Sequence, residues 1–219
     1  MAPRHVRSRH KMITDALVLS PFPHIIWTNL FDTELLQTAR EEFDSIPDGH
    51  WIKYENSHER KWALTFAGAG PACNEVAGYL QSKTFIDLLQ ETFSIDGLSY
   101  SDLGGGLHRI LPGGMLDVHV DFNIHDDGRY RRLNVLTYLN SDPDPSGDLW
   151  LCQNWPQSDA TIRVPAKLGH TVAFATSDTS WHGHPTPLVG NERRSLAAYY
   201  YTQHPPEHYS SPHSTIFKS

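Results

Sequence analysis

The chain has 219 residues, enough for one domain with a sizeable core. Hydrophobic residues make up 39% and charged residues 20%, a balance that is typical of globular proteins and excludes a disordered chain. Eighteen basic and 25 acidic residues give a net charge of −7, which argues against a nucleic-acid partner, and no apolar stretch is long enough for a membrane span.

Features of the N-terminus and the cysteine count bear on the compartment. Residues 1–11 are basic, but no apolar signal segment follows them. Cys73 and Cys152 are too few for a disulfide scaffold in a chain of this size, which fits a reducing environment. We therefore expect a cytoplasmic protein with no membrane partner; the oligomeric state is left open.

The first hundred residues are predicted to be largely helical. Asp32 and Thr33 can cap a helix that runs to about Ile46, and a second helical pattern extends from Cys73 to Phe93. Between the two, the segment from Trp51 to Trp62 mixes aromatic and charged residues. Its pattern fits either a lid over a site or a loop packed on a sheet.

After residue 100 the pattern changes to short β-type runs separated by turn residues. Eight runs are predicted: Gly106–Leu111, Leu116–Asn123, Leu133–Asn140, Gly147–Cys152, Thr161–Val164, Thr171–Ala175, Ser180–His184 and Arg194–Thr202. Strands that follow helices in this way predict a mainly β protein with α, a double-stranded β-helix (jelly roll) whose N-terminal helices buttress one sheet. A plain β-sandwich is the alternative.

The pattern is interpreted as a single domain over residues 1–219. It would comprise a flexible tail at 1–20, a helical or lid region at 21–100, a jelly-roll core at 101–204 and a second tail at 205–219.

A possible metal site begins with His119 and Asp121. Residues two apart on a strand point to the same side, so both side chains can reach one ion. Two histidines and one carboxylate are the ligands of non-haem iron oxygenases. A third ligand would come from a distant strand, and His182 and His184, in the tetrapeptide WHGH, are the candidates. His-x-Asp alone is a weak signal.

The joint pattern is more specific. Residues 104–202 resemble the prolyl-4-hydroxylase-like branch of the 2-oxoglutarate/Fe(II)-dependent dioxygenase superfamily. The resemblance is carried, in order, by HRILPGGMLDVHVDFNIHDDGRYRRLNVLTYLN, SGDLWL, VPAKLGHTVAFATSDTSWHGHPTPL and RRSLAAYYYT. It implies Fe(II) ligands at His119, Asp121 and His182, with His184 as the alternative third ligand. One departure is the stretch Ser146–Leu149, where the family usually has Gly-Gly-Glu-Leu.

The resemblance also implies a site for the co-substrate 2-oxoglutarate. Arg193 lies eleven residues after His182 and six before Tyr199, the spacing of the family's basic residue that pairs with the distal carboxylate. Arginine suits this role because its planar fork binds a carboxylate in two-pronged fashion. Ser195 shares the face of Arg193, whereas Arg194 is expected to point to solvent.

The strand from Arg132 to Asn140 supplies further contacts. Alternation places Asn134, Leu136 and Tyr138 on one face. The resemblance implies that Tyr138 donates its hydroxyl to the distal carboxylate. Asn134 would lie nearer the metal, beside the chelating carboxylate or the substrate.

The activity implied is hydroxylation of an unactivated C–H bond by O₂, with 2-oxoglutarate released as succinate and CO₂ and ascorbate as a supporting reductant. The substrate would be a small molecule or a prolyl or other peptidyl residue. Two alternatives remain. One is a cupin-type metal enzyme that does not use 2-oxoglutarate and has no need of Arg193; the other is a catalytically silent jelly-roll binding module, which has no need of a complete ligand triad.

Overall fold

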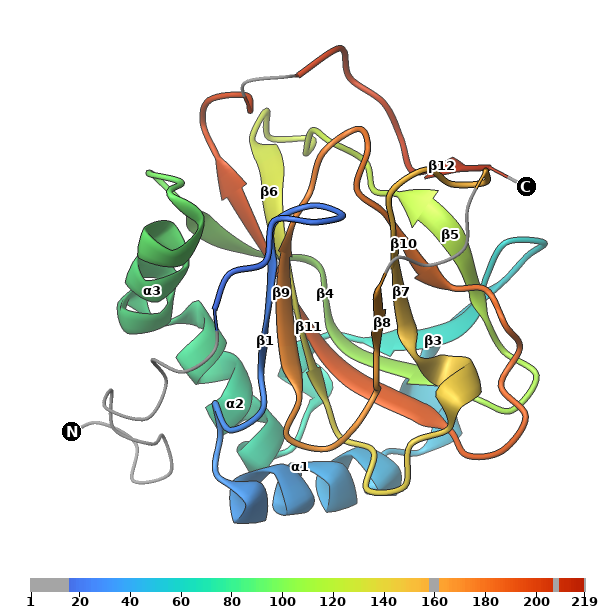
Figure 1. The fold of residues 1–219 in the computed structure, drawn as a ribbon. Coiled ribbons are helices and arrows are strands. Elements are labelled where there is room, and N and C mark those ends of the chain that lie inside the picture. Colours follow the sequence, from blue (N-terminus) through green and yellow to red (C-terminus); the bar gives the residue numbers. More distant parts are fainter. Residues whose placement is uncertain (1–15, 158–161, 207–208, 219) are drawn as a thin grey trace.

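The computed structural model describes residues 16–157, 162–206 and 209–218. Most of the tail expected at residues 1–20 lies outside these ranges. Three helices precede most of the strands: α1 (Thr33–Ser45), α2 (Pro71–Gln81) and α3 (Lys83–Phe93). Figure 1 shows them together on one side of the molecule, against the sheet that contains β1, β9 and β11. No helix of the described part is long and apolar enough to cross a membrane.

The strands form two antiparallel sheets. The seven-stranded sheet has the order β1-β9-β6-β11-β4-β3-β2, and the five-stranded sheet has the order β12-β5-β10-β7-β8. The strands of the larger sheet are β1 (His24–Trp27), β2 (Ile52–Glu55), β3 (Arg60–Leu64), β4 (Ser99–Ile110), β6 (Tyr130–Tyr138), β9 (Thr171–Ala175) and β11 (Arg193–Thr202). Those of the smaller sheet are β5 (Leu116–Val120), β7 (Leu149–Cys152), β8 (Ile162–Val164), β10 (Trp181–His184) and β12 (Ile216–Phe217).

Alternation along the central strands separates two cores. On β6, Leu133 and Val135 pack with the helices, whereas Leu136 and Tyr138 belong to the cluster that includes residues of both sheets. The helices therefore cover the outer face of the larger sheet, and every second residue of β6 and β11 faces the smaller sheet. This arrangement confirms the predicted jelly roll with buttressing helices.

The predicted elements differ from the observed ones mainly in the first half. The single helix expected from Cys73 to Phe93 is two helices, because Ser82 between them has an extended backbone and caps α3 by accepting a hydrogen bond from the Phe85 amide. The strands β1, β2, β3 and β12 were not predicted. By contrast, α1 begins as expected, with the Asp32 side chain accepting from the Glu34 amide.

The segment from Trp51 to Trp62 is a β-hairpin at the edge of the larger sheet. Strands β2 and β3 pair with each other, and β3 pairs with β4. Trp51 and Trp62 are buried in the core, while Lys61 lines the cavity described below. The hairpin thus packs on the sheet and also contributes one wall of that cavity.

Candidate active site

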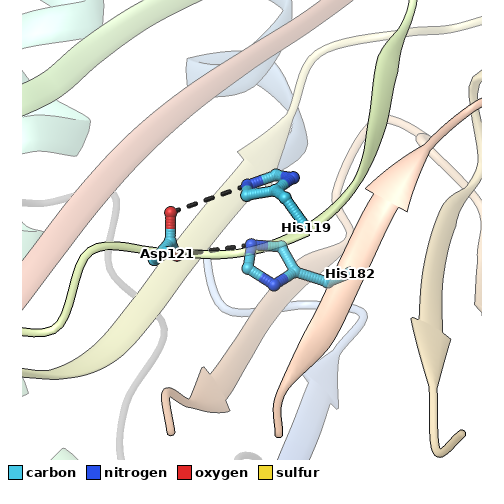
Figure 2. A group of neighbouring side chains, drawn as sticks. All are labelled: His119, Asp121 and His182. Atoms are coloured by element: carbon cyan, nitrogen blue, oxygen red, sulfur yellow. Dashed lines mark ion pairs between the residues drawn. The ribbon is translucent and has the colours of Figure 1, made fainter. Parts of the chain in front are cut away.

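Three side chains from two neighbouring strands meet in the smaller sheet. His119, on β5, lies directly opposite His182, on β10, and Asp121 follows two residues after His119. The Nε2 atoms of His119 and His182 lie 3.6 and 3.3 Å from the Asp121 carboxylate. Figure 2 shows both rings and the carboxylate pointing toward one another. Candidate ligand atoms of all three lie within 4.8 Å of one another, so they can reach a single metal ion.

Backbone carbonyls fix both imidazole rings. The Nδ1 of His119 donates to the Asp117 carbonyl, and that of His182 donates to the Ser180 carbonyl, each over 2.8 Å. A proton on Nδ1 leaves the Nε2 lone pair for a metal, and such partners commonly orient metal-binding histidines. Burial lowers the pKa of His119, which favours its neutral, ligating form.

Asp121 is held from its other side by two residues of β6. Asn134 Nδ2 donates to Asp121 Oδ2 over 2.7 Å, and Arg131 Nη2 lies 3.2 Å from the same oxygen. Arg131 Nε also donates to Asn134 Oδ1 over 2.9 Å. Burial alone would raise the pKa of Asp121, but the neighbouring Arg131 and His182 outweigh it and hold that pKa well below its usual range. The carboxylate is therefore anionic, with Oδ2 engaged by donors.

Three of the four residues expected at the co-substrate site, Tyr138, Arg193 and Ser195, come together on neighbouring strands of the larger sheet. Arg193 is 6% exposed; its Nε donates to the Gly147 carbonyl over 2.9 Å, and its Nη2 donates to the Tyr138 hydroxyl over 3.0 Å. Ser195 lies opposite Tyr138 in the sheet. Burial raises the pKa of Tyr138 although Arg193 opposes the shift, so the hydroxyl keeps a proton to donate. Asn134 lies farther along β6, beside Asp121.

The metal cluster, Arg193 and Ser195 line one cavity between the two sheets, whereas Tyr138 contacts Arg193 but is not among the lining residues. The walls of the cavity include His119, Asp121, Asn134, His182, Arg193 and Ser195. Among the described residues, Arg193 forms no ion pair and the buried Ser195 hydroxyl has no hydrogen-bond partner. These two groups suit an anionic ligand that chelates a metal ion at one end and binds the Arg193 charge and the Ser195 hydroxyl at the other.

Two neighbouring residues, Arg194 and His184, stand outside the metal cluster. Arg194 turns away from the cavity, as strand alternation predicts, but it does not point to solvent as expected: its side chain is 14% exposed and pairs with Asp44 and Glu192. His184 lines the cavity but is not part of the metal cluster.

Arg131 was missed at the sequence level because of a β-bulge. Regular alternation from Asn134 would turn Arg132 inward and Arg131 outward. In β6, however, Tyr200 pairs with Leu133 and Tyr201 with Arg131, so one extra residue breaks the alternation. Arg131 then reaches Asp121, with its guanidinium carbon 3.8 Å from the centre of the Tyr199 ring.

Comparisons with known proteins identify a matching family model. Residues 105–201 match the model of the 2OG-Fe(II) oxygenase superfamily. No curated protein matches the chain.

Solved structures share the fold. A Pseudomonas putida prolyl-4-hydroxylase is similar at 18% identity with a TM-score of 0.64, covering 85% of this chain and 96% of its own. A Trichoplax adhaerens prolyl hydroxylase, solved with a hypoxia-inducible factor peptide fragment, is similar at 17% identity with a TM-score of 0.60, covering 82% and 84%. HygX from Streptomyces hygroscopicus, solved with nickel and 2-oxoglutarate, is similar at 14% identity with a TM-score of 0.57, covering 82% of both chains. Residues 105–201 therefore resemble the 2OG-Fe(II) oxygenase superfamily by the matched family model, and the solved structures share the two-sheet fold.

Proposed function

We propose that His119, Asp121 and His182 hold the Fe(II) of this oxygenase. The two histidines would bind through Nε2, because each Nδ1 is committed to a backbone carbonyl. Asp121 would bind through Oδ1, because Oδ2 already accepts from Asn134 and pairs with Arg131. Three protein ligands on one face leave positions for the co-substrate and O₂.

Arg193, Tyr138 and Ser195 bind the distal carboxylate of 2-oxoglutarate in this proposal, and Asn134 stands at the chelating end. The observation that carries the proposal is the buried charge of Arg193, which lines the metal cavity without forming an ion pair in the described part of the chain. Asp148 acts on Arg193 electrostatically, but no ion pair joins the two among the described residues, so the buried guanidinium favours an anion in direct contact. A cupin-type enzyme that does not use 2-oxoglutarate would have no use for this cation.

When bound, iron and 2-oxoglutarate supply the oxidising chemistry: O₂ is consumed, 2-oxoglutarate leaves as succinate and CO₂, and one oxygen atom enters a substrate C–H bond. The chain holds these groups in register and limits water. Phe174, Leu136 and Leu149 give the cavity apolar walls, and the Phe174 ring packs 4.7 Å from the His182 ring, centre to centre. Removal of water strengthens the charge pairing inside the cavity.

The substrate proposed is a small molecule or a peptidyl residue, prolyl included. One structural neighbour was solved with a peptide and another with hygromycin B, so this fold accommodates both classes in those proteins. We place the enzyme in the cytoplasm, on the basis of its two cysteines, both of them buried. Ascorbate is proposed as a supporting reductant.

Succinate formation tests this function. The protein would be supplied with Fe(II), 2-oxoglutarate, O₂ and ascorbate, with and without a panel of peptides, free amino acids and other small molecules. We expect iron-dependent succinate, stimulated by one class in the panel and absent from the His119→Ala variant. A protein that binds iron but neither binds nor consumes 2-oxoglutarate would support the cupin-type alternative, and one that binds neither would support the silent binding module.

A further inference from the structure

His184 is a buried histidine whose ring has no hydrogen-bond partner. It is 1% exposed, and neither Nδ1 nor Nε2 finds a partner among the described residues. A neutral imidazole always carries one N–H donor and one acceptor nitrogen, so a dry apolar surrounding would leave both unsatisfied. Buried polar groups without partners are rare and call for a ligand or a water.

The backbone of β10 directs this ring into the metal cavity. His182 pairs with His119 and His184 with Leu116, so β5 has one more residue than β10 between the two pairs. Gly183 lies so close to β5 that an added Cβ would come within 2.7 Å of the Asp117 carbonyl oxygen and 2.8 Å of that of Leu116. A glycine at this position therefore permits the close strand approach that places both His182 and His184 in the cavity wall.

The displacement of His184 from the metal matches the length of the co-substrate. Two residues along a strand span about 6.6 Å, so His184 lies roughly that far along the wall from His182. An extended five-carbon chain with C–C bonds of about 1.5 Å separates its terminal carbons by about 5 Å. A dicarboxylate that is chelated at the metal and extends along this wall would bring its far end near His184, whose electrostatic neighbours include Arg193.

Other unpaired groups line the same cavity. The Ser195 hydroxyl has no partner, and Arg193 forms no ion pair in the described part of the chain. Two positions of the Arg193 guanidinium, Nε and Nη2, already donate to the Gly147 carbonyl and the Tyr138 hydroxyl. A carboxylate can accept about four hydrogen bonds, whereas a two-pronged contact with a guanidinium supplies two. A carboxylate bound to Arg193 therefore has room for further donors.

We propose that His184 donates a hydrogen bond to the distal carboxylate of 2-oxoglutarate and so selects a co-substrate that carries this group. The inference rests on the proposed function. In this proposal His184, the alternative third metal ligand of the sequence analysis, contacts the co-substrate instead. The cluster of His119, Asp121 and His182 already offers three ligands without it.

The test compares two substitutions of similar size, His184→Leu, which removes the donor, and His184→Gln, which keeps one. Each Fe(II)-loaded protein is titrated without O₂ while the metal-to-ligand charge-transfer band is followed. The two ligands are 2-oxoglutarate and 2-oxopentanoate, which has the same chain length and chelating end but no distal carboxylate. Iron content is measured for each protein.

Loss of a hydrogen bond to a charged group predicts that His184→Leu weakens 2-oxoglutarate binding by about 10- to 100-fold. Binding of 2-oxopentanoate should change by less than about threefold, and His184→Gln should recover most of the loss. A purely structural role would weaken both ligands alike.

Three results would overturn the inference: equal losses for the two ligands, no loss in His184→Leu, or loss of iron in that variant, which would make His184 a metal ligand. If the unaltered protein binds iron without developing the band, the 2-oxoglutarate function itself fails, whatever the two variants do.

Discussion

Arg193 carries a buried positive charge that forms no ion pair among the described residues. Its substitution tests the proposed co-substrate site most directly. A buried ion pair that loses one partner costs roughly 3–5 kcal/mol, much of it from the charge that is left behind. The Arg193 side chain is only 6% exposed, so solvent does little to screen that loss. At 1.4 kcal/mol per tenfold, Arg193→Ala should weaken 2-oxoglutarate binding by about two to four orders of magnitude.

Arg194 provides the matched control on the same strand. Its guanidinium pairs with Asp44 and Glu192 on the far side of the sheet. Arg194→Ala should lower the free energy of unfolding by about 1–3 kcal/mol and leave 2-oxoglutarate binding unchanged. The assay is titration of the charge-transfer band without O₂ for the unaltered protein and both variants. Equal damage from the two substitutions would refute the assigned strand facing.

The free protein gives a second, independent readout. In Arg193→Met, relief of the buried charge is opposed by loss of the hydrogen bonds to the Gly147 carbonyl and the Tyr138 hydroxyl, so we expect only a small change in the melting temperature of the protein without co-substrate. The rise in melting temperature on adding 2-oxoglutarate should, however, disappear. A variant that is both less stable and still stabilised by 2-oxoglutarate would show that Arg193 has a structural role.

Three further predictions concern the metal site and the pH. Ala at any of the three proposed ligands should abolish iron binding and turnover; full iron content in His182→Ala together with its loss in His184→Ala would reassign the third ligand. Asn134→Leu removes the donor to Asp121 Oδ2 and should weaken metal binding by about 10- to 100-fold in competition with a chelating dye, because residues that hold a ligand commonly contribute that much. Burial, with the charges of nearby cations, lowers the pKa of His108 to about 3, so below pH 6.5 the unfolded chain takes up a proton that the fold does not. His108 should therefore contribute a fall of up to about 2 kcal/mol in the free energy of unfolding between pH 7 and pH 5, and His108→Gln should lack this component in denaturation at the two pH values.

The strands whose two faces meet different surroundings could be predicted from the sequence. On β6 and β11, period-two alternation places Tyr138, Arg193 and Ser195 inward, because a one-residue shift would expose the core face of each strand. The helix α1 was also predictable, since the Asp32 cap and its apolar spacing agree. The same logic placed Arg194 on the opposite face.

Other features depend on contacts that no local pattern encodes. Arg131 turns inward because of a bulge opposite Tyr200 and Tyr201. The helical spacing runs through Ser82 without interruption, so it does not reveal that this residue ends α2 and caps α3. Strand β12 contains two residues, which pair with β5 only after the chain has returned to that edge. Such positions are set by tertiary pairing, so they became visible only in the fold.

The proposed metal site lies on the smaller sheet, whereas the proposed distal-carboxylate site draws on the larger sheet and on His184 of β10, and this division has a consequence for co-substrate binding. The proposed iron ligands lie on or directly after β5 and β10 of the smaller sheet, whereas Tyr138, Arg193 and Ser195 lie on β6 and β11 of the larger one. A co-substrate that bridges metal and arginine must therefore span the gap between the sheets, whose width is set by the core packed between them. Rigid packing in that core keeps the chelating and distal ends of the site at a fixed separation. If the proposed contacts hold, selectivity for the length of the co-substrate would be a property of the jelly-roll core as well as of the residues that touch the carboxylates.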